Sequence, residues 1–245
     1  GWPVRLKAPE GAPNILLIMT DDVGFASAST FGGPIPTPNL DRLAKEGLRY
    51  NRFHTTGICS PTRAALLTGR NHHHVGTGML TDLALGYPGY NAAFPRSAAT
   101  VAKTLRLNGY STAMFGKHHN VPSDEQSLGG PFDHWPVGLG FDYFFGCIGG
   151  DIHKYQPRLF RNGSPVDEPG PDGVLLGQRL VDDAIRWVHN QKASDPDKPF
   201  FLYFADPTLH APHHVPPEWI AQWRAAASML SHCGAACFPA MTMLT

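Results

Sequence analysis

Three apolar runs stand out along the chain, and charged or polar residues follow each of them directly. The runs cover residues 14–20, 110–115 and 199–204. The three segments predict strands, and the first, a continuous apolar run, is expected near the centre of a parallel sheet. The carboxyl ends of parallel strands meet at one edge, where open α/β sheets bind their ligands. The pattern therefore predicts a functional site formed by the residues that follow the three runs.

The segments between these runs predict the rest of an α/β fold. Helices are expected over residues 37–47, 97–108 and 174–191, from helical spacing of apolar side chains and from cap residues. Residues 48–54 alternate enough to predict a further strand. Residues 120–172 are rich in Gly, Pro and Asp and predict long loops with at most one hairpin. The expected fold class is thus α/β, with a mostly parallel central sheet flanked by helices.

The composition indicates a globular protein without a broad charged surface. Of the 245 residues, 42% are hydrophobic and 16% are charged, and 20 basic residues balance 20 acidic ones. This balance argues against a general nucleic-acid binder, so any anion must be recognised locally. No apolar run approaches the length of a membrane span. The 4 cysteines are spaced too irregularly to indicate a disulfide framework.

A short helix is expected where the chain reads Cys-Ser-Pro-Thr-Arg-Ala-Ala-Leu-Leu-Thr-Gly-Arg, starting at Cys59. Ser60 can cap this helix, Pro61 suits its first position and Gly69 ends it. Cys59 would then lie at the helix N-terminus, where exposed backbone N–H groups favour anions. Arg63, about one turn further along, can add a positive charge near the same point.

The residues leave three interpretations of Cys59 open. The first is a buried or disulfide-bonded cysteine, and the second is a thiolate nucleophile whose pKa is lowered by the helix and by Arg63. The third rests on a resemblance, because the stretch from Cys59 to Arg70 resembles the signature of the type I sulfatases. In that family a formylglycine-generating enzyme oxidises the cysteine to Cα-formylglycine, whose hydrated aldehyde is the nucleophile. The resemblance implies that Cys59 supplies this nucleophile and that Arg63 holds the nucleophile and the sulfate in place.

Asp21 and Asp22 follow the first apolar run and are candidate metal ligands. Adjacent carboxylates repel each other unless a cation or another partner offsets them, which favours a hard metal such as calcium or magnesium. The alternative is a turn that ends the strand, with Asp as its cap. The sulfatase resemblance identifies this pair, together with the oxidised Cys59, as the metal ligands. It implies Ca²⁺, with Mg²⁺ or Mn²⁺ as alternatives.

Two further motifs follow the other apolar runs. Gly-Lys-His-His at residues 116–119 resembles the Gly-Lys-x-His element of the sulfatases. It implies that Lys117 binds the anion and that His119 is the base beside the formylglycine hydroxyl, although the family often has tryptophan where His118 stands. His210 begins a His-x-Pro sequence, and the resemblance implies that it binds sulfate and assists the leaving oxygen. Without the resemblance, the motif at residues 116–119 would be an exposed loop with a chance basic cluster.

The resemblance implies a sulfuric ester hydrolase, similar to arylsulfatases, whose substrate is a small-molecule sulfate ester. A phosphonate monoester or phosphodiester hydrolase on the same scaffold is the first alternative. A truncated chain that only binds anions is the second, because the later half of family members supplies an Asp-Asn metal pair and a lysine that are not found here. The expected partners include no nucleic acid and no membrane.

The resemblance covers only part of the chain. Residues 1–224 are expected to be the N-terminal part of a sulfatase catalytic domain, with the fold of the alkaline phosphatase superfamily and the C-terminal part missing. Residues 225–245 contain no Asp, Glu, Lys or Arg and are expected to lie outside that fold. His232, Cys233 and Cys237 lack the ligand number and spacing of a zinc site.

Overall fold

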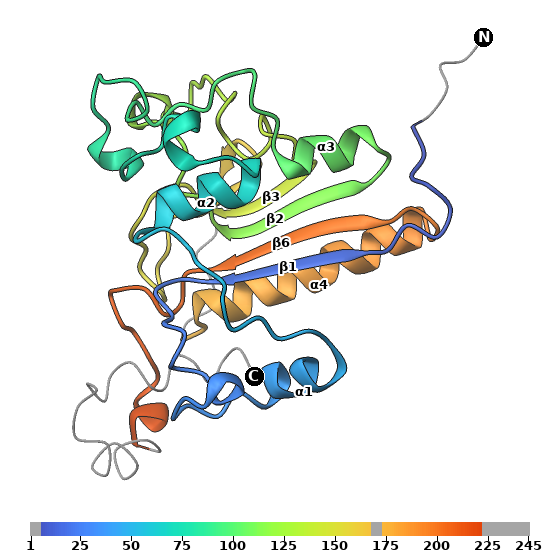
Figure 1. Ribbon diagram of the computed structural model, residues 1–245, viewed down its shortest axis with the longest axis vertical. Helices are drawn as coiled ribbons and strands as arrows, with labels where there is room; N and C mark the ends of the chain where they lie inside the picture. The colour runs from blue at the N-terminus through green and yellow to red at the C-terminus, as the bar shows by residue number, and fades with distance from the viewer. Residues whose placement is uncertain (1–5, 168–172, 222–245) are drawn as a thin grey trace.

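A six-stranded sheet forms the centre of this computed structural model, which describes residues 6–167 and 173–221 (Figure 1). The strands are β1 Ile15–Thr20, β2 Ser111–Lys117, β3 Tyr143–Cys147, β4 Phe160–Arg161, β5 Ser164–Pro165 and β6 Phe200–Asp206. Their order across the sheet is β1-β6-β2-β3-β4-β5. The first four in that order run parallel, and the short β4 and β5 add an antiparallel edge. This arrangement confirms the predicted α/β fold class with a mostly parallel sheet.

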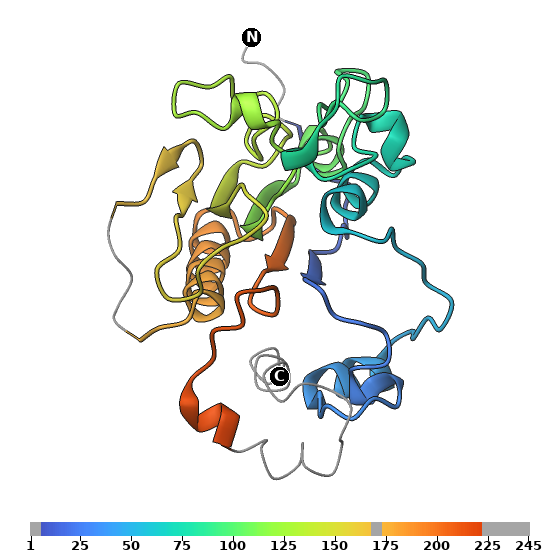
Figure 2. The ribbon, with the colours of Figure 1, turned by 90° about the vertical axis from the view of Figure 1, so that its left-hand side faces the viewer.

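Helices cover both faces of the sheet and give the molecule three layers (Figures 1 and 2). The α-helices are α1 Pro38–Glu46, α2 Cys59–Thr68, α3 Val101–Leu107 and α4 Leu176–Ser194. Short 3₁₀ helices are η1 Ser29–Phe31, η2 His72–Val75, η3 Thr81–Leu83 and η4 Ser123–Glu125. α4 packs on one face of the sheet, while α2 and α3 pack on the other. No helix in the described ranges is long and apolar enough to span a bilayer.

The two covered faces explain why β6 and the middle of β2 are continuously apolar. Successive side chains of a strand point to opposite faces. Phe115 packs with Leu180 of α4, whereas its neighbour Met114 joins Tyr203 and Phe141 in the cluster on the other face. Since both faces are buried, both residues are apolar, and period-two alternation is lost.

Two expectations about the strands are wrong: the central place of the first strand and the strand over residues 48–54. β6, not β1, lies inside the parallel part of the sheet, because β6 pairs with β1 on one side and β2 on the other. Within the described residues β1 is an edge strand, and its Leu16 and Ile18 side chains are 60% and 49% exposed. Residues 48–54 form no strand and are exposed, since no neighbouring strand accepts their backbone hydrogen bonds.

The segment expected to be loops contains more structure than one hairpin. Besides the β4–β5 hairpin, residues 120–172 supply the whole of β3. The three expected helices are present as α1, α3 and α4, with shorter or shifted ends. The expected domain boundary at residues 224 and 225, with the uncharged tail and its histidine and cysteines, lies outside the described residues.

Candidate active site

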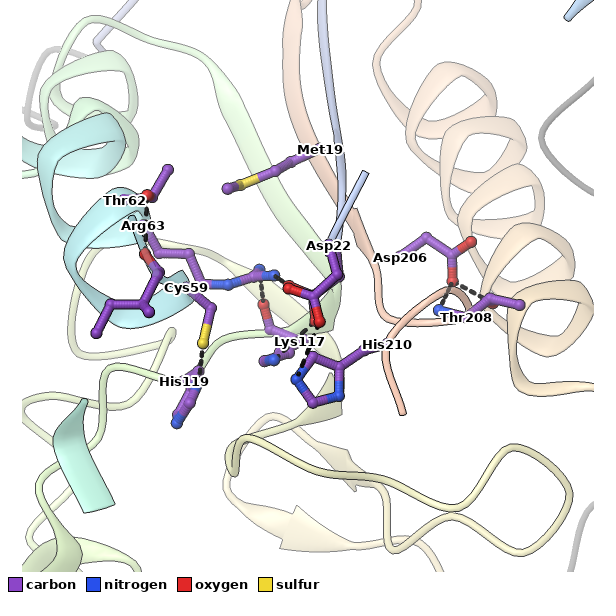
Figure 3. Close-up of polar contacts among 12 residues, drawn as sticks. Met19, Asp22, Cys59, Thr62, Arg63, Lys117, His119, Asp206, Thr208 and His210 are labelled. Atoms are coloured by element: carbon purple, nitrogen blue, oxygen red, sulfur yellow. Dashed lines mark hydrogen bonds and ion pairs between the residues drawn. The ribbon is translucent and has the colours of Figure 1, made fainter. Parts of the chain in front are cut away.

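Three strand ends and one helix start meet at the same edge of the sheet. Asp21 follows β1, Lys117 ends β2 and His210 lies four residues beyond the end of β6. Cys59 is the first residue of α2, whose N-terminus points to this edge (Figures 1 and 3). The structure therefore brings together all the segments that the hydrophobic pattern placed at the site.

The helix that carries Cys59 begins earlier than predicted. Ile58 is its extended N-cap residue, and Ser60 makes no capping hydrogen bond, so the prediction of a Ser60 cap is wrong. Instead, Ser60 Oγ accepts a hydrogen bond from the backbone N–H of Thr81 at 3.4 Å. Pro61 still falls within the first turn, where its missing N–H has no helical partner to lose. Gly69 ends the helix in a left-handed conformation, as predicted.

Asp21 joins two buried cations in one ion cluster. Its Oδ1 accepts from Arg63 Nη2 at 3.0 Å, and its Oδ2 accepts from Lys117 Nζ at 2.7 Å. Arg63 Nη1 also donates to the Lys117 carbonyl oxygen at 2.7 Å, which ties α2 to the end of β2. Burial alone would raise the pKa of Asp21, but the charges of Arg63 and Lys117 outweigh it and keep that pKa below its usual value. Asp21 is thus an ionised carboxylate that holds both cations in place.

Asp22 follows Asp21 but faces solvent. Its backbone is left-handed, with φ 59°, and its side chain is 60% exposed. His210 Nε2 lies 3.6 Å from Asp22 Oδ2, and His210 Nδ1 lies 3.4 Å from Asp151 Oδ1. Figure 3 shows the His210 ring turned toward Asp22 from the loop after β6. The residues after β1 and β6 therefore approach one another across the strand edge.

Cys59 faces His119, and His119 in turn faces a carboxylate. Cys59 Sγ lies 3.1 Å from His119 Nδ1 (Figure 3), and His119 Nε2 lies 2.8 Å from Asp82 Oδ2. His119 has a left-handed backbone, with φ 52°, and is almost fully buried. Burial lowers the pKa of His119, as does the charge of Lys117, while Asp82 acts in the opposite direction. The imidazole is therefore neutral at neutral pH, as a proton acceptor must be.

His118, which stands where the sulfatases often have tryptophan, is a buried packing residue. Its Nε2 donates to the carbonyl oxygen of His134 at 3.1 Å. Burial lowers its pKa from 6.5 to about 3, so the ring is neutral and carries no charge into the site. His118 therefore lies buried between Lys117 and His119 without adding a charge to the site.

The residues present fit a divalent cation in part. Asp21 and Asp22 offer the hard carboxylate oxygens that Ca²⁺ prefers. In the described ranges, however, no three His, Cys, Asp or Glu side chains are grouped so as to hold a metal ion. Ca²⁺ takes about six to eight oxygen ligands, so the two aspartates would supply only some of them.

Three polar residues near the site were missed by sequence reasoning. Asp82 lies in η3, after no apolar run, and nothing in its sequence surroundings marks it. Asp206 ends β6 and is buried, and burial raises its pKa while hydrogen bonds from Thr208 oppose that shift. Lys154 is fully buried, and its Nζ donates to the Ile152 carbonyl oxygen at 3.0 Å. Of these three, Asp206 carried a signal that could have identified it, because it lies where a buried strand runs into polar residues.

Comparison with known sequences connects this geometry to one family. A family model described as Sulfatase matches residues 13–232. The chain is 32% identical over 240 residues to an uncharacterized sulfatase of Schizosaccharomyces pombe, covering 89% of this chain and 41% of that protein. It is 29% identical over 231 residues to an arylsulfatase of Klebsiella aerogenes, covering 89% of this chain and 47% of that enzyme. The chain thus spans less than half the length of these relatives.

Solved structures show the same fold. The crystal structure of Ps i-CgsB in complex with k-i-k-neocarrahexaose is 28% identical, with a TM-score of 0.68 over 95% of this chain and 54% of that one. A protein in the alkaline phosphatase superfamily from Vibrio parahaemolyticus, at 18% identity, shares the fold with a TM-score of 0.52 over 94% of this chain and 48% of that one.

Proposed function

Since this chain belongs to the sulfatase family, we propose that it hydrolyses sulfate esters. The observation that carries the proposal is the position of Cys59. It begins α2, its Sγ faces His119 Nδ1 at 3.1 Å, and the cations Arg63 and Lys117 meet on Asp21 beside it. A reacting group at position 59 would therefore have a proton acceptor and fixed positive charges close to it.

We further propose that Cys59 acts as Cα-formylglycine, formed by a formylglycine-generating enzyme. When present, this group supplies a geminal diol, of which one hydroxyl is the nucleophile and the other lets the aldehyde re-form. His119 would accept a proton from a hydroxyl at position 59, because its neutral Nδ1 already faces that side chain. Lys117 and Arg63 would offset the charge of the sulfate, which is spread over its oxygens.

His210 and the two aspartates complete the proposal. His210 would bind the sulfate and assist the leaving oxygen, since its ring lies between Asp22 and Asp151 at the open side of the site. Asp21 and Asp22 would hold Ca²⁺, or Mg²⁺ or Mn²⁺. Further oxygen donors would complete its coordination, since no group of three ligands is found among the described residues. When bound, the ion would polarise a sulfate oxygen.

The test is turnover of an aryl sulfate by the protein co-expressed with a formylglycine-generating enzyme, assayed with and without Ca²⁺. Mass spectrometry of the peptide that contains residue 59 measures its conversion. The matched aryl phosphonate ester distinguishes a sulfatase from a phosphonate monoester hydrolase. Calcium-dependent phenol release that is lost in Cys59→Ala supports the proposal. Preference for the phosphonate, or no turnover by converted protein, contradicts it.

A further inference from the structure

We propose that Asp82 is a positioning residue that holds the His119 ring in the tautomer required for proton transfer at position 59. This inference rests on the proposed function, because it assigns a partner to the same base. Asp82 follows no strand and belongs to no motif of the sequence, yet its Oδ2 lies 2.8 Å from His119 Nε2.

Hydrogen-bond chemistry fixes which atom donates in each of the two hydrogen bonds that link Asp82, His119 and residue 59. An ionised carboxylate can only accept hydrogen bonds, so His119 Nε2 carries the hydrogen and donates it to Asp82. In a neutral ring the other nitrogen, Nδ1, is then an acceptor. Nδ1 is the atom that lies 3.1 Å from Cys59 Sγ, so the thiol donates to it. A hydroxyl in place of the thiol would find the same acceptor.

The 3₁₀ helix that carries Asp82 is attached to both reacting residues. The buried Thr81 donates from its backbone N–H to Ser60 Oγ, next to Cys59, and from its Oγ1 to the His119 carbonyl oxygen, both at 3.4 Å. Ser123 Oγ also donates to the Thr81 carbonyl oxygen at 3.3 Å. These hydrogen bonds of Thr81, the residue next to Asp82, therefore hold Asp82 in place relative to Cys59 Sγ and the His119 ring.

Gly150 packs directly against the His119–Asp82 pair. A Cβ atom built on Gly150 would lie 2.7 Å from His119 Cε1 and 2.8 Å from His119 Nε2, closer than real Cβ contacts. The same Cβ would lie 3.4 Å from Asp82 Oδ2. The His119 ring is thus held by its hydrogen bond to Asp82 on one atom and by the backbone of Gly150 packed against it. These two contacts leave the ring little freedom to rotate.

The step that this arrangement serves is a single proton transfer. The O–H bond of a hydroxyl at position 59 breaks, its electron pair stays on oxygen, and the lone pair of Nδ1 takes the proton. The Nε2–H group keeps its bond to Asp82, so the positive ring that forms lies against a carboxylate. Without Asp82, the hydrogen can sit on Nδ1 instead, and Nδ1 then cannot accept.

The tautomer can be measured without any enzymatic activity. We would record long-range ¹H–¹⁵N spectra of the unconverted chain with ¹⁵N-labelled histidine, and assign His119 by its absence from His119→Gln. The expected result is hydrogen on Nε2 in the parent and in Asp82→Glu, and a mixture of tautomers in Asp82→Ala. Hydrogen on Nδ1 in the parent, or an unchanged His119 signal in Asp82→Ala, would overturn the inference.

Kinetics on the converted enzyme provide the second readout. Asp82→Asn and Asp82→Ala are expected to lower kcat about 10- to 100-fold. KM should stay within about twofold, because Asp82 does not face the sulfate-binding cations. Asp82→Glu should recover part of kcat. The matched control is Asp124→Asn, an exposed aspartate in η4 that should leave both constants unchanged.

Circular dichroism of each variant shows whether it is folded, and folded Asp82→Ala with parental kcat would disprove the positioning role. A rise in KM at unchanged kcat would also contradict it. If the parent enzyme itself turns over no sulfate ester, the proposed function fails, while the tautomer measurement still decides the role of Asp82.

Discussion

At the scale of single residues, the site depends on one carboxylate that serves two cations. Asp21 is buried with Arg63 and Lys117, and both of its oxygens are engaged. Removing one member of a buried ion cluster leaves the others desolvated and uncompensated. Its neighbour Asp22 carries the same side chain on the surface, so the two positions form a natural pair for comparison.

We expect Asp21→Asn to lower the free energy of unfolding by about 3–5 kcal/mol, because two buried positive charges lose their counter-ion. Asp22→Asn, whose side chain is 60% exposed, should change it by less than about 0.5 kcal/mol. Urea denaturation followed by circular dichroism measures both. Equal effects of the two substitutions would show that the ion cluster does not stabilise the fold.

The same carboxylate predicts how stability depends on pH. The pKa of Asp21 is lower in the folded chain than the ordinary aspartate value of 3.8, because Arg63 and Lys117 lie against it, so folding favours its ionised form. Its contribution is fully present above that unfolded value and is lost as the pH falls through the lower folded one. In urea titrations between about pH 5 and pH 2, the parent should lose this contribution and Asp21→Asn should lack it. Parallel curves for the two proteins would contradict the assignment.

At the scale of secondary-structure elements, the sequence predicted which segments form helices and strands better than it predicted which strands lie side by side in the sheet. The apolar runs that form β2 and β6 are buried on both faces, so composition alone identified them. The interior place of β6 and the edge place of β1 depend on pairing between residues almost two hundred positions apart, which no local pattern encodes. β3 was missed because its strand is short and lies between Gly-rich loops.

The same distinction holds for the site. Cys59, Lys117 and His210 lie at ends of elements that the pattern could locate. Asp82 reaches His119 only through the packing of η3 on α2, so a sequence could not reveal it. Likewise, residues 48–54 alternate like a strand, but a strand forms only where another strand accepts its hydrogen bonds.

Close approach of β2 and β6 at Gly116 sets the position of Lys117. Gly116 has φ +99°, and a Cβ there would lie 2.0 Å from the Ala205 carbonyl oxygen. We expect Gly116→Ala to separate the strands and to cost at least about 2 kcal/mol more than Gly69→Ala. Gly69 also has a left-handed backbone but no atom within 4 Å of the added Cβ, so only about 1 kcal/mol should be lost there. Equal losses in unfolding free energy would refute this account of the contact.

At the scale of the whole molecule, the number of oxygen donors limits how tightly this chain can bind calcium. Asp21, Asp22 and Asp206 are carboxylates at the strand edge, and Asp206 is buried and bonded to Thr208. No group of three ligands is assembled within the described part, and residues 225–245 contain no Asp or Glu. Ca²⁺ sites become weaker as charged ligands are removed. We therefore expect the 245-residue chain to bind Ca²⁺ with a Kd of about 10⁻⁴–10⁻³ M.

Isothermal titration calorimetry of the unconverted chain measures this affinity, with Asp22→Asn as the test variant and Asp124→Asn as the matched control. Asp22 is chosen because its side chain is exposed, so its loss removes a ligand and leaves the buried ion cluster intact. Asp22→Asn should abolish the heat of binding, and Asp124→Asn should retain it. A micromolar Kd would mean that further residues of this chain complete the site, and binding that survives in Asp22→Asn would place the ion elsewhere on the protein.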